Sequence, residues 1–110
     1  QIKQVILNLS INAIETMPQG GSLTIRTGLD PQDGMVFVRV SDNGPGISAE
    51  TLPNIFEPFF TTKEGGTGLG LSVSYEIVQS HNGRIEVQSE VGVGTIFTVY
   101  LPFKRAVPVT

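Results

Sequence analysis

The chain has 110 residues, 39% apolar and 15% charged, a composition that predicts one folded domain and excludes a disordered chain. Its net charge of −3 and the absence of any basic run argue against nucleic acid as a partner. It has no cysteine, which excludes disulfides and thiolate metal sites and fits a reducing, cytoplasmic compartment.

Residues 2–17 are predicted to form an amphipathic helix that ends at the Pro18–Gly21 segment. Asn8, Asn12 and Glu15 are expected on a different face from the apolar stripe. Because a helical pattern begins at the first residue, we expect the chain to be one domain of a longer protein. The predicted stripe consists of Ile2, Val5, Ile6, Leu9, Ala13, Ile14 and Met17.

Two antiparallel hairpins are predicted from alternating apolar residues. The first pairs residues 22–27 with 35–41 across a turn at 30–34, and places Leu23 and Ile25 on one face. The second pairs residues 84–89 with 95–101 and ends at Pro102.

Between the hairpins the sequence predicts a loop over 42–48, a short helix over 49–54 with Ser48 as its N-cap, and a long helix over 69–81. Gly83 is expected to adopt the left-handed conformation that ends this helix. The element order predicts an α+β domain over 1–103, with helices on one face of the sheet and a loose tail at 104–110. No apolar run reaches the roughly 20 residues of a membrane span, so we expect no membrane contact by this domain.

The stretch GGTGLGLS, residues 65–72, places four glycines directly before the second long helix. A helix N-terminus exposes unpaired N–H groups, and phosphate can bind there if no side chain blocks the backbone. The alternative is a flexible loop followed by a helix cap. Leu71 stands where a dinucleotide fingerprint needs glycine, and no lysine follows Lys63 until Lys104, so a Walker A loop is absent.

Other polar residues are candidates for the same site. Asn8 and Asn12 are neighbours on one helix face, and their amide oxygens suit Mg²⁺; two solvated side chains are the alternative. Asp42 follows a buried strand and could accept a hydrogen bond from an exocyclic amino group, or could be an ordinary turn residue. Lys63 could neutralise a phosphate or be solvated. Phe56, Phe59 and Phe60 are most simply core residues.

Four segments in sequence resemble the motifs of sensor histidine kinases. Residues 8–13 resemble the N box, and residues 42–47 resemble the G1 box. Residues 56–63 are similar to the F box, and residues 66–71 to the G2 box. Their order agrees with the family, and together with the closing strands they span nearly the whole chain.

The resemblance implies a Bergerat ATP-binding fold, a two-layer sandwich with a mixed, largely antiparallel sheet, and ATP and Mg²⁺ as cofactors. Asn12 would bind Mg²⁺, with Asn8 beside the phosphates and Lys63 at the γ-phosphate. Asp42 would hold the adenine amino group, and Thr95 would assist through a water. Gly46 would lie beside the base, and Phe56 and Phe59 would anchor a lid, of which residues 61–68 are expected to be mobile without nucleotide. The other motif residues implied at the nucleotide are Gly44, Ile47, Gly66, Thr67, Gly68, Leu69, Gly70 and Leu71.

The wider ATPase group includes hydrolysing members with a glutamate four residues before the metal-binding asparagine. Here Asn8 holds that position, and an amide cannot act as a general base. The resemblance therefore implies phosphoryl transfer by positioning and charge neutralisation rather than steady hydrolysis. The alternatives are a protein-serine kinase of the anti-sigma type and a nucleotide-binding interaction module without turnover.

The single histidine, His81, is expected to be a structural residue at a helix end rather than a phosphate acceptor. The implied partners are a histidine-bearing dimerisation domain of the same parent protein and a response regulator. The isolated domain is expected to be a monomer with little turnover of ATP.

Overall fold

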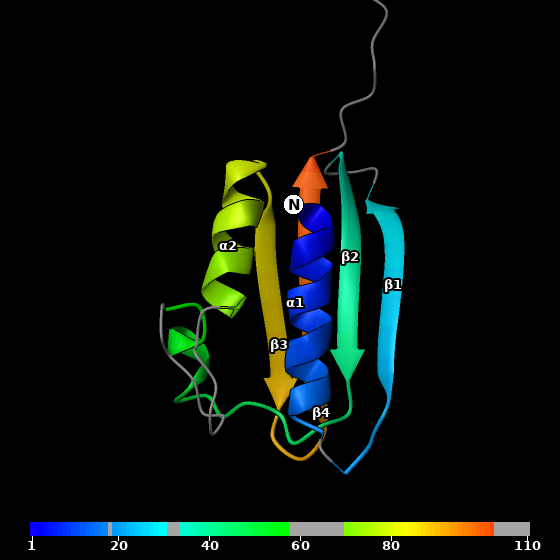
Figure 1. Ribbon diagram of the computed structural model, residues 1–110, viewed down its shortest axis with the longest axis vertical. Helices are drawn as coiled ribbons and strands as arrows, with labels where there is room; N and C mark the ends of the chain where they lie inside the picture. The colour runs from blue at the N-terminus through cyan, green and yellow to red at the C-terminus, as the bar shows by residue number, and fades with distance from the viewer. Residues whose placement is uncertain (18, 31–33, 58–69, 103–110) are drawn as a thin grey trace, which may run out of the picture.

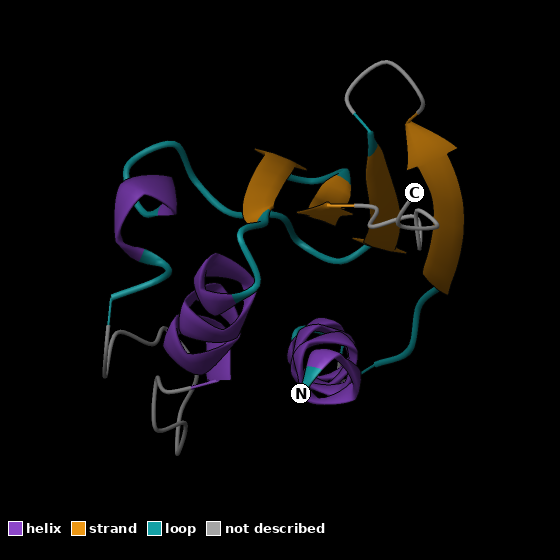
Figure 2. Cartoon of the chain, turned by 90° about the horizontal axis from the view of Figure 1, so that it is seen from above, coloured by secondary structure: helices purple, strands orange, loops and turns teal. Residues whose placement is uncertain are grey.

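The computed structural model describes residues 1–17, 19–30, 34–57 and 70–102, which form two layers. One layer is a four-stranded sheet, and the other contains helices α1 (Ile2–Glu15) and α2 (Gly70–Ser80), which cover a single face of that sheet (Figures 1 and 2). The predicted α+β sandwich is confirmed. All pairings among the described strands are antiparallel.

The two predicted hairpins are the two halves of the sheet. β1 (Leu23–Asp30) pairs with β2 (Met35–Asp42), and β3 (Arg84–Glu90) pairs with β4 (Gly94–Pro102). The halves join through β2 and β4, so the strand order is β1-β2-β4-β3. This junction places Val40 opposite Phe97 and the last residue of β2, Asp42, opposite Thr95.

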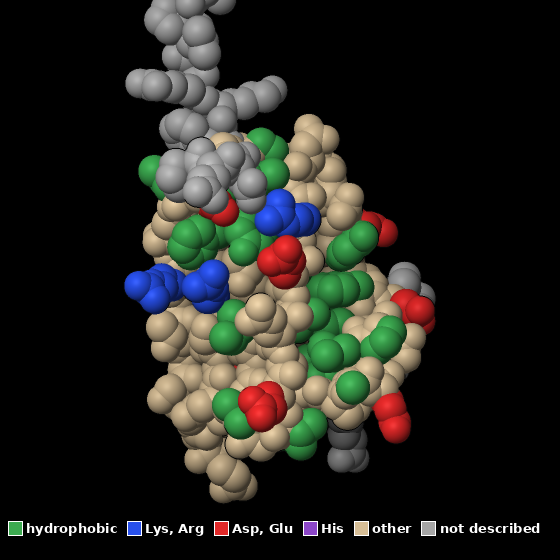
Figure 3. Space-filling model, turned by 180° about the vertical axis from the view of Figure 1, so that it is seen from behind, with side chains coloured by type: hydrophobic (Ala, Val, Ile, Leu, Met, Phe, Trp, Pro, Cys, Tyr) green, Lys and Arg blue, Asp and Glu red, His purple; other side chains and the backbone are tan. Residues whose placement is uncertain are grey.

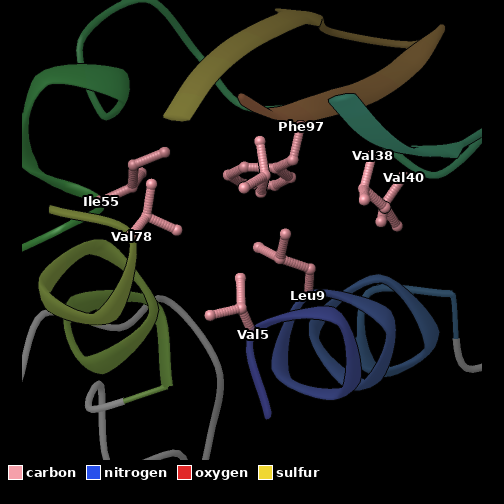
Figure 4. Packing of buried hydrophobic residues seen from close by; sticks show 8 residues of the cluster. Val5, Leu9, Val38, Val40, Ile55, Val78 and Phe97 are labelled. Carbon is pink, nitrogen blue, oxygen red and sulfur yellow. The ribbon is translucent and has the colours of Figure 1, made fainter. Parts of the chain in front are cut away.

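The hydrophobic core lies between the sheet and the two helices (Figure 4). On α1 the helical spacing buries Val5, Leu9 and Ala13. Full burial of one such larger side chain contributes about 1.5–3 kcal/mol to stability. The other buried apolar residues are Val38, Val40, Ile55, Val78, Phe97 and Val99.

The outward face of α1 differs from the prediction. Ile14 was expected in the buried stripe, but it is 56% exposed and lies near the similarly exposed Leu7 and Ile11. Ile14 follows Val5 by nine residues, which at about 100° per residue puts it on the opposite side of the helix. The helix also ends at Glu15, two residues before its predicted end.

β1 is an edge strand, which explains a second departure. The register places Ile25 opposite Val40, hence on the covered face as predicted, yet Ile25 is 49% exposed. It has a neighbouring strand on one side only. Alternation therefore predicted the correct face of the sheet but not the depth of burial.

The helix predicted over 49–54 is wrong in length and type. Only η1 (Leu52–Asn54), a 3₁₀ turn, is helical there. Pro53 has no N–H and disfavours the α conformation at Leu52, which prevents a regular α-helix. Ser48 instead closes the preceding turn, where its Oγ accepts a hydrogen bond from the Thr51 N–H at 3.3 Å.

The end of α2 also differs from the prediction. Asn82, and not Gly83, adopts the left-handed conformation, with φ 61°. The Asn82 N–H donates to the Gln79 carbonyl (3.0 Å) and the Gly83 N–H to the Val78 carbonyl (2.9 Å), which is a Schellman ending. Glycine is needed at 83 for another reason: a Cβ there would collide with the carbonyl oxygen of Tyr100.

The other face of the sheet is left uncovered by the helices (Figure 3). Arg39 lies over the ring of Phe37, with 5.0 Å between its guanidinium carbon and the ring centroid, and Arg84 lies over Tyr100 at 4.1 Å. Arg39 Nε also donates to Thr98 Oγ1 at 3.3 Å. Arg39 and Arg84 thus each stack on an aromatic ring of a neighbouring position.

Several predictions lie outside the described residues. They concern Pro18, the centre of the first turn, the lid residues 61–68, and the tail over 104–110. Among the described helices, none is long and apolar enough to cross a membrane.

Candidate functional site

Asn8 joins the first helix to the start of the second. Its Nδ2 donates hydrogen bonds to the Gly70 carbonyl oxygen (3.4 Å) and to Ser74 Oγ (3.3 Å). Ser74 Oγ in turn donates to the Gly70 carbonyl at 2.8 Å. Asn8 of the segment 8–13 and Gly70 of the segment 66–71, which are 62 residues apart in the sequence, thus meet in one place.

Asn12 lies one helical turn after Asn8. Because α1 and α2 run in opposite directions (Figure 1), Asn12 lies beyond the first turn of α2, toward the end of the sheet where β2 ends. Asn12 is half-buried and takes part in an interaction of its own. Gly70 is exposed, and apart from its chain neighbours and the backbone of its own helix, no described atom lies within 4 Å of the position that a Cβ would take there.

Asp42 lies half-buried at the end of β2. Its Oδ1 accepts a hydrogen bond from the Gly44 N–H at 2.8 Å, which forms an Asx turn. The second carboxylate oxygen is not part of this turn. Asp42 faces the helix layer, since it shares the face of Val40 and Val38 along the strand.

Thr95 lies opposite Asp42 and is only 5% exposed. Its Oγ1 is 2.8 Å from Ser89 Oγ, which accepts from the Ile47 N–H (2.7 Å) and donates to the Gly94 carbonyl (3.1 Å). Because Gly94 uses the one proton of Ser89, the Thr95 hydroxyl donates to Ser89. Ser89 therefore ties the loop over 42–47 to the two strands of the second hairpin.

Two glycines allow this loop to approach the turn between β3 and β4. Gly46 has φ 78°, and a Cβ there would collide with the Glu90 carbonyl oxygen. Gly94 has φ 150°, and a Cβ there would collide with the Asp42 carbonyl oxygen. The fold itself thus requires glycine at 46, whether or not a ligand packs on it. At Gly44 a Cβ would lie 3.0 Å from Met17 Cγ, a tight contact.

Phe56 anchors the segment that follows η1. The centroid of its ring lies 5.4 Å from the ring centroid of Tyr75 on α2 and 6.2 Å from that of Phe97 on β4. Leu71, in the first turn of α2, packs against the same core. Phe56 thus contributes to the core, as the sequence predicted, and holds this segment beside α2.

A hollow of about 350 Å³ lies at the end of the sheet where β2 ends and β4 begins. Asp42 and Thr95 line it, but so do Ser41 and Ile96, which alternate with them and therefore face the uncovered side. The hollow is therefore not the space beside the start of α2, and we assign no ligand to it.

The family follows from comparison with known proteins. Residues 1–105 match the family model described as "Histidine kinase-, DNA gyrase B-, and HSP90-like ATPase". The chain belongs to this family. Sporulation kinase E of Bacillus subtilis (strain 168) is 47% identical over 105 residues, which are 96% of this chain and 14% of that protein. The chain thus spans only a small part of the length of this curated relative.

Solved structures of histidine kinases share the fold. Full-length ShkA in complex with AMPPNP matches with a TM-score of 0.85 at 30% identity, over 98% of this chain and 23% of that one. The catalytic domain of the histidine kinase ThkA, in a nucleotide-free form, matches with a TM-score of 0.78 at 40% identity, over 92% of this chain and 65% of that one. The predicted resemblance to histidine kinase catalytic domains is confirmed.

In this histidine kinase-like fold, most of the described candidates form two groups. Asn8, Gly70 and Leu71 lie where α1 meets α2, with Asn12 one helical turn further along α1. The second group, at the end of the central strands, consists of Asp42, Gly44, Gly46, Ile47 and Thr95. Phe56 belongs to neither group and packs against Tyr75 and Phe97. His81 lies exposed directly after the end of α2, at the helix-end position that the sequence predicted, and its Nδ1 is 2.8 Å from the Ile77 carbonyl oxygen. The candidates outside the described residues are Phe59, Lys63, Gly66, Thr67, Gly68 and Leu69.

Two serines were missed by the sequence analysis. Ser74 contacts Asn8, and Ser89 contacts both Thr95 and Ile47. Each serine faces inward from its element. Ser74 lies three residues after Leu71 on α2, and Ser89 lies two residues after Val87 on β3. At both positions the periodic pattern favours an apolar residue. A serine at a position where the helix or strand pattern predicts an apolar side chain was the signal that could have identified both residues.

Proposed function

We propose that this chain is the catalytic, ATP-binding domain of a sensor histidine kinase. It binds Mg²⁺–ATP and donates the γ-phosphoryl group to a histidine on a separate dimerisation domain, from which a response regulator receives it. The observation that carries the proposal is the contact of Asn8 with the Gly70 carbonyl oxygen, which joins the N box to the start of the G2-box helix.

The triphosphate occupies the start of α2 in this proposal. The first turn of a helix offers unpaired N–H groups and a partial positive charge, and the open space beside Gly70 leaves the backbone accessible. Lys63, Gly66, Thr67, Gly68 and Leu69 complete this part of the site.

Magnesium is assigned to Asn12, with Asn8 beside the phosphates. The described residues contain no cluster of three or more acidic or histidine side chains that could hold a metal. An amide oxygen together with phosphate oxygens is, however, a ligand set that Mg²⁺ accepts. The ion would neutralise negative charge on the phosphates.

The adenine is assigned to the end of the central strands. The Asp42 oxygen that is free of the Asx turn accepts a hydrogen bond from the exocyclic amino group, and Thr95 assists through a water. Gly44, Gly46 and Ile47 line the base, and Phe56 and Phe59 support the lid.

The reaction breaks the bond between the γ-phosphorus and the β–γ bridging oxygen, and it forms a bond from that phosphorus to a ring nitrogen of the acceptor histidine; ADP leaves. This chain supplies position and charge neutralisation. Asn8 cannot remove a proton from water, so hydrolysis is slow. The acceptor domain belongs to the same parent protein, which carries the present domain in the cytoplasm.

Replacement of Asn12 by alanine tests the metal assignment. We expect calorimetry to show Mg²⁺–ATP binding weakened by about tenfold or more, since a group that holds the metal is lost. The Asn12→Ala variant should then bind ATP equally with and without Mg²⁺. Gln4→Ala, which removes an exposed amide from the same helix, is the matched control. Wild-type Mg²⁺ dependence in Asn12→Ala would refute the assignment.

The transfer step needs an acceptor. Incubated with γ-labelled ATP and a histidine-bearing dimerisation domain, the chain should produce an acid-labile phosphohistidine. An acid-stable phosphoserine, or no labelled product with any histidine acceptor, would contradict the proposed activity.

A further inference from the structure

Ser74 occupies a position where the helix pattern calls for an apolar side chain. With Leu71 and Val78 it faces inward from α2, and it is completely buried. Burial of a hydroxyl costs free energy unless the group is hydrogen-bonded. The contacts of Ser74 therefore bear on why a serine occurs there.

The hydrogen bonds of Ser74 fix the orientation of the Asn8 amide. Ser74 Oγ has one proton and donates it to the Gly70 carbonyl oxygen at 2.8 Å. Toward Asn8, therefore, both Ser74 Oγ and the Gly70 oxygen present only lone pairs. Nδ2 must face these two acceptors, at 3.3 and 3.4 Å, and Oδ1 is turned away from them.

We infer that Ser74 is a positioning residue that, together with the Gly70 carbonyl, holds the Asn8 amide in one orientation and ties α1 to the first turn of α2. This link sets where Asn12, one turn further along α1, stands relative to the first N–H groups of α2. The inference rests on the proposed function, in which those groups share one nucleotide.

Ser80 offers an internal comparison. Its Oγ makes the same kind of bond to its own helix, to the Ile77 carbonyl oxygen at 2.7 Å, but Ser80 is exposed at the other end of α2. Ser80 Oγ also lies 3.3 Å from Nδ1 of its chain neighbour His81. A serine whose hydrogen bonds stay within its own helix and the residue that follows it would behave like Ser80. Ser74 differs because its oxygen also accepts from a second helix.

The first experiment needs no nucleotide. The side-chain amide signals of Asn8, assigned by ¹⁵N NMR, should shift in Ser74→Ala because Nδ2 loses one acceptor. Ser80→Ala should leave them in place. Alanine is a good helix former, so both variants should fold. Unchanged Asn8 signals in Ser74→Ala would overturn the inference even if nucleotide binding were never detected.

The second experiment measures coupling through Mg²⁺–ATP affinity. Ser74→Ala should weaken binding about three- to tenfold, as expected for loss of one hydrogen bond. The same change made in Asn8→Ala should have no further effect, because Ser74 acts through Asn8. Additive losses would refute positioning. If the wild type itself bound no nucleotide, the proposed function would fail while the NMR result still decided the role of Ser74.

An isosteric variant separates orientation from ligation. Asn8→Asp keeps one side-chain oxygen but replaces the NH₂ group, so an oxygen would face the Gly70 carbonyl. We expect affinity for Mg²⁺–ATP to fall about as far as in Asn8→Ala. An affinity equal to or above the wild type would mean that only the oxygen of Asn8 matters, and would contradict the inference.

Discussion

The covered face of the sheet contains two regions, one held by apolar packing and the other by hydrogen bonds. In its middle, Val40 and Phe97 lie opposite each other and are almost fully buried beneath the helices. At its end, Asp42 and Thr95 occupy the next equivalent positions on the same strands, where they meet Ser89 and the loop over 42–47. Two residues along a strand thus separate non-directional packing from directional hydrogen bonding.

The difference shows what each region contributes. Apolar packing in the middle supplies stability and tolerates many side chains of suitable volume. The polar end depends on individual atoms, because each hydrogen bond fixes a particular donor against a particular acceptor. Changes in the middle should therefore alter the free energy of unfolding, and changes at the end should alter ligand binding more than stability.

The largest expected effect is in the middle of the sheet. Phe97→Ala should lower the free energy of unfolding by about 3–5 kcal/mol, because it leaves a cavity between the sheet and the helices. Urea denaturation followed by circular dichroism measures this. Ile14→Ala, on the exposed side of α1, is the control and should change stability by less than about 0.5 kcal/mol. If the two variants lost the same free energy of unfolding, Phe97 would not belong to the core between the sheet and the helices.

A smaller change is expected at the polar end. Asp42→Asn keeps the oxygen that accepts from Gly44, so the loop should remain folded. The amide cannot offer a second acceptor oxygen, and ATP affinity should fall about tenfold, which is roughly 1.4 kcal/mol. Calorimetry with ATP and GTP would also show reduced preference for adenine. Unchanged preference would exclude Asp42 from base recognition.

The smallest effect is expected at Ser89, a residue of the polar end whose hydrogen-bond partners are other protein groups. Ser89→Ala removes the acceptor of the Ile47 N–H and the partner of Thr95, and should cost about 1 kcal/mol of stability. Ser41→Ala, two strands away and on the uncovered face, provides the comparison. A Ser89→Ala variant as stable as the wild type would show that Ser89 does not hold the loop.

Local pattern predicted much of the fold. Helical spacing identified α1 and α2, alternation identified both hairpins, and the motif order indicated the family. The failures were also local: Pro53 shortened one helix to a 3₁₀ turn, and Asn82 took the left-handed position expected of Gly83. Several residue types can satisfy one turn, so composition alone does not choose among them.

The sequence by itself determined the two long helices and the four strands, because those choices depend on side chains a few residues apart. Only the tertiary structure decided that β2 pairs with β4, so that Asp42 meets Thr95, and that Asn8 reaches Ser74 across 66 residues. Such partners depend on strand register and on the rotation of each helix about its axis. Both are set by packing of the whole core, which no local pattern encodes.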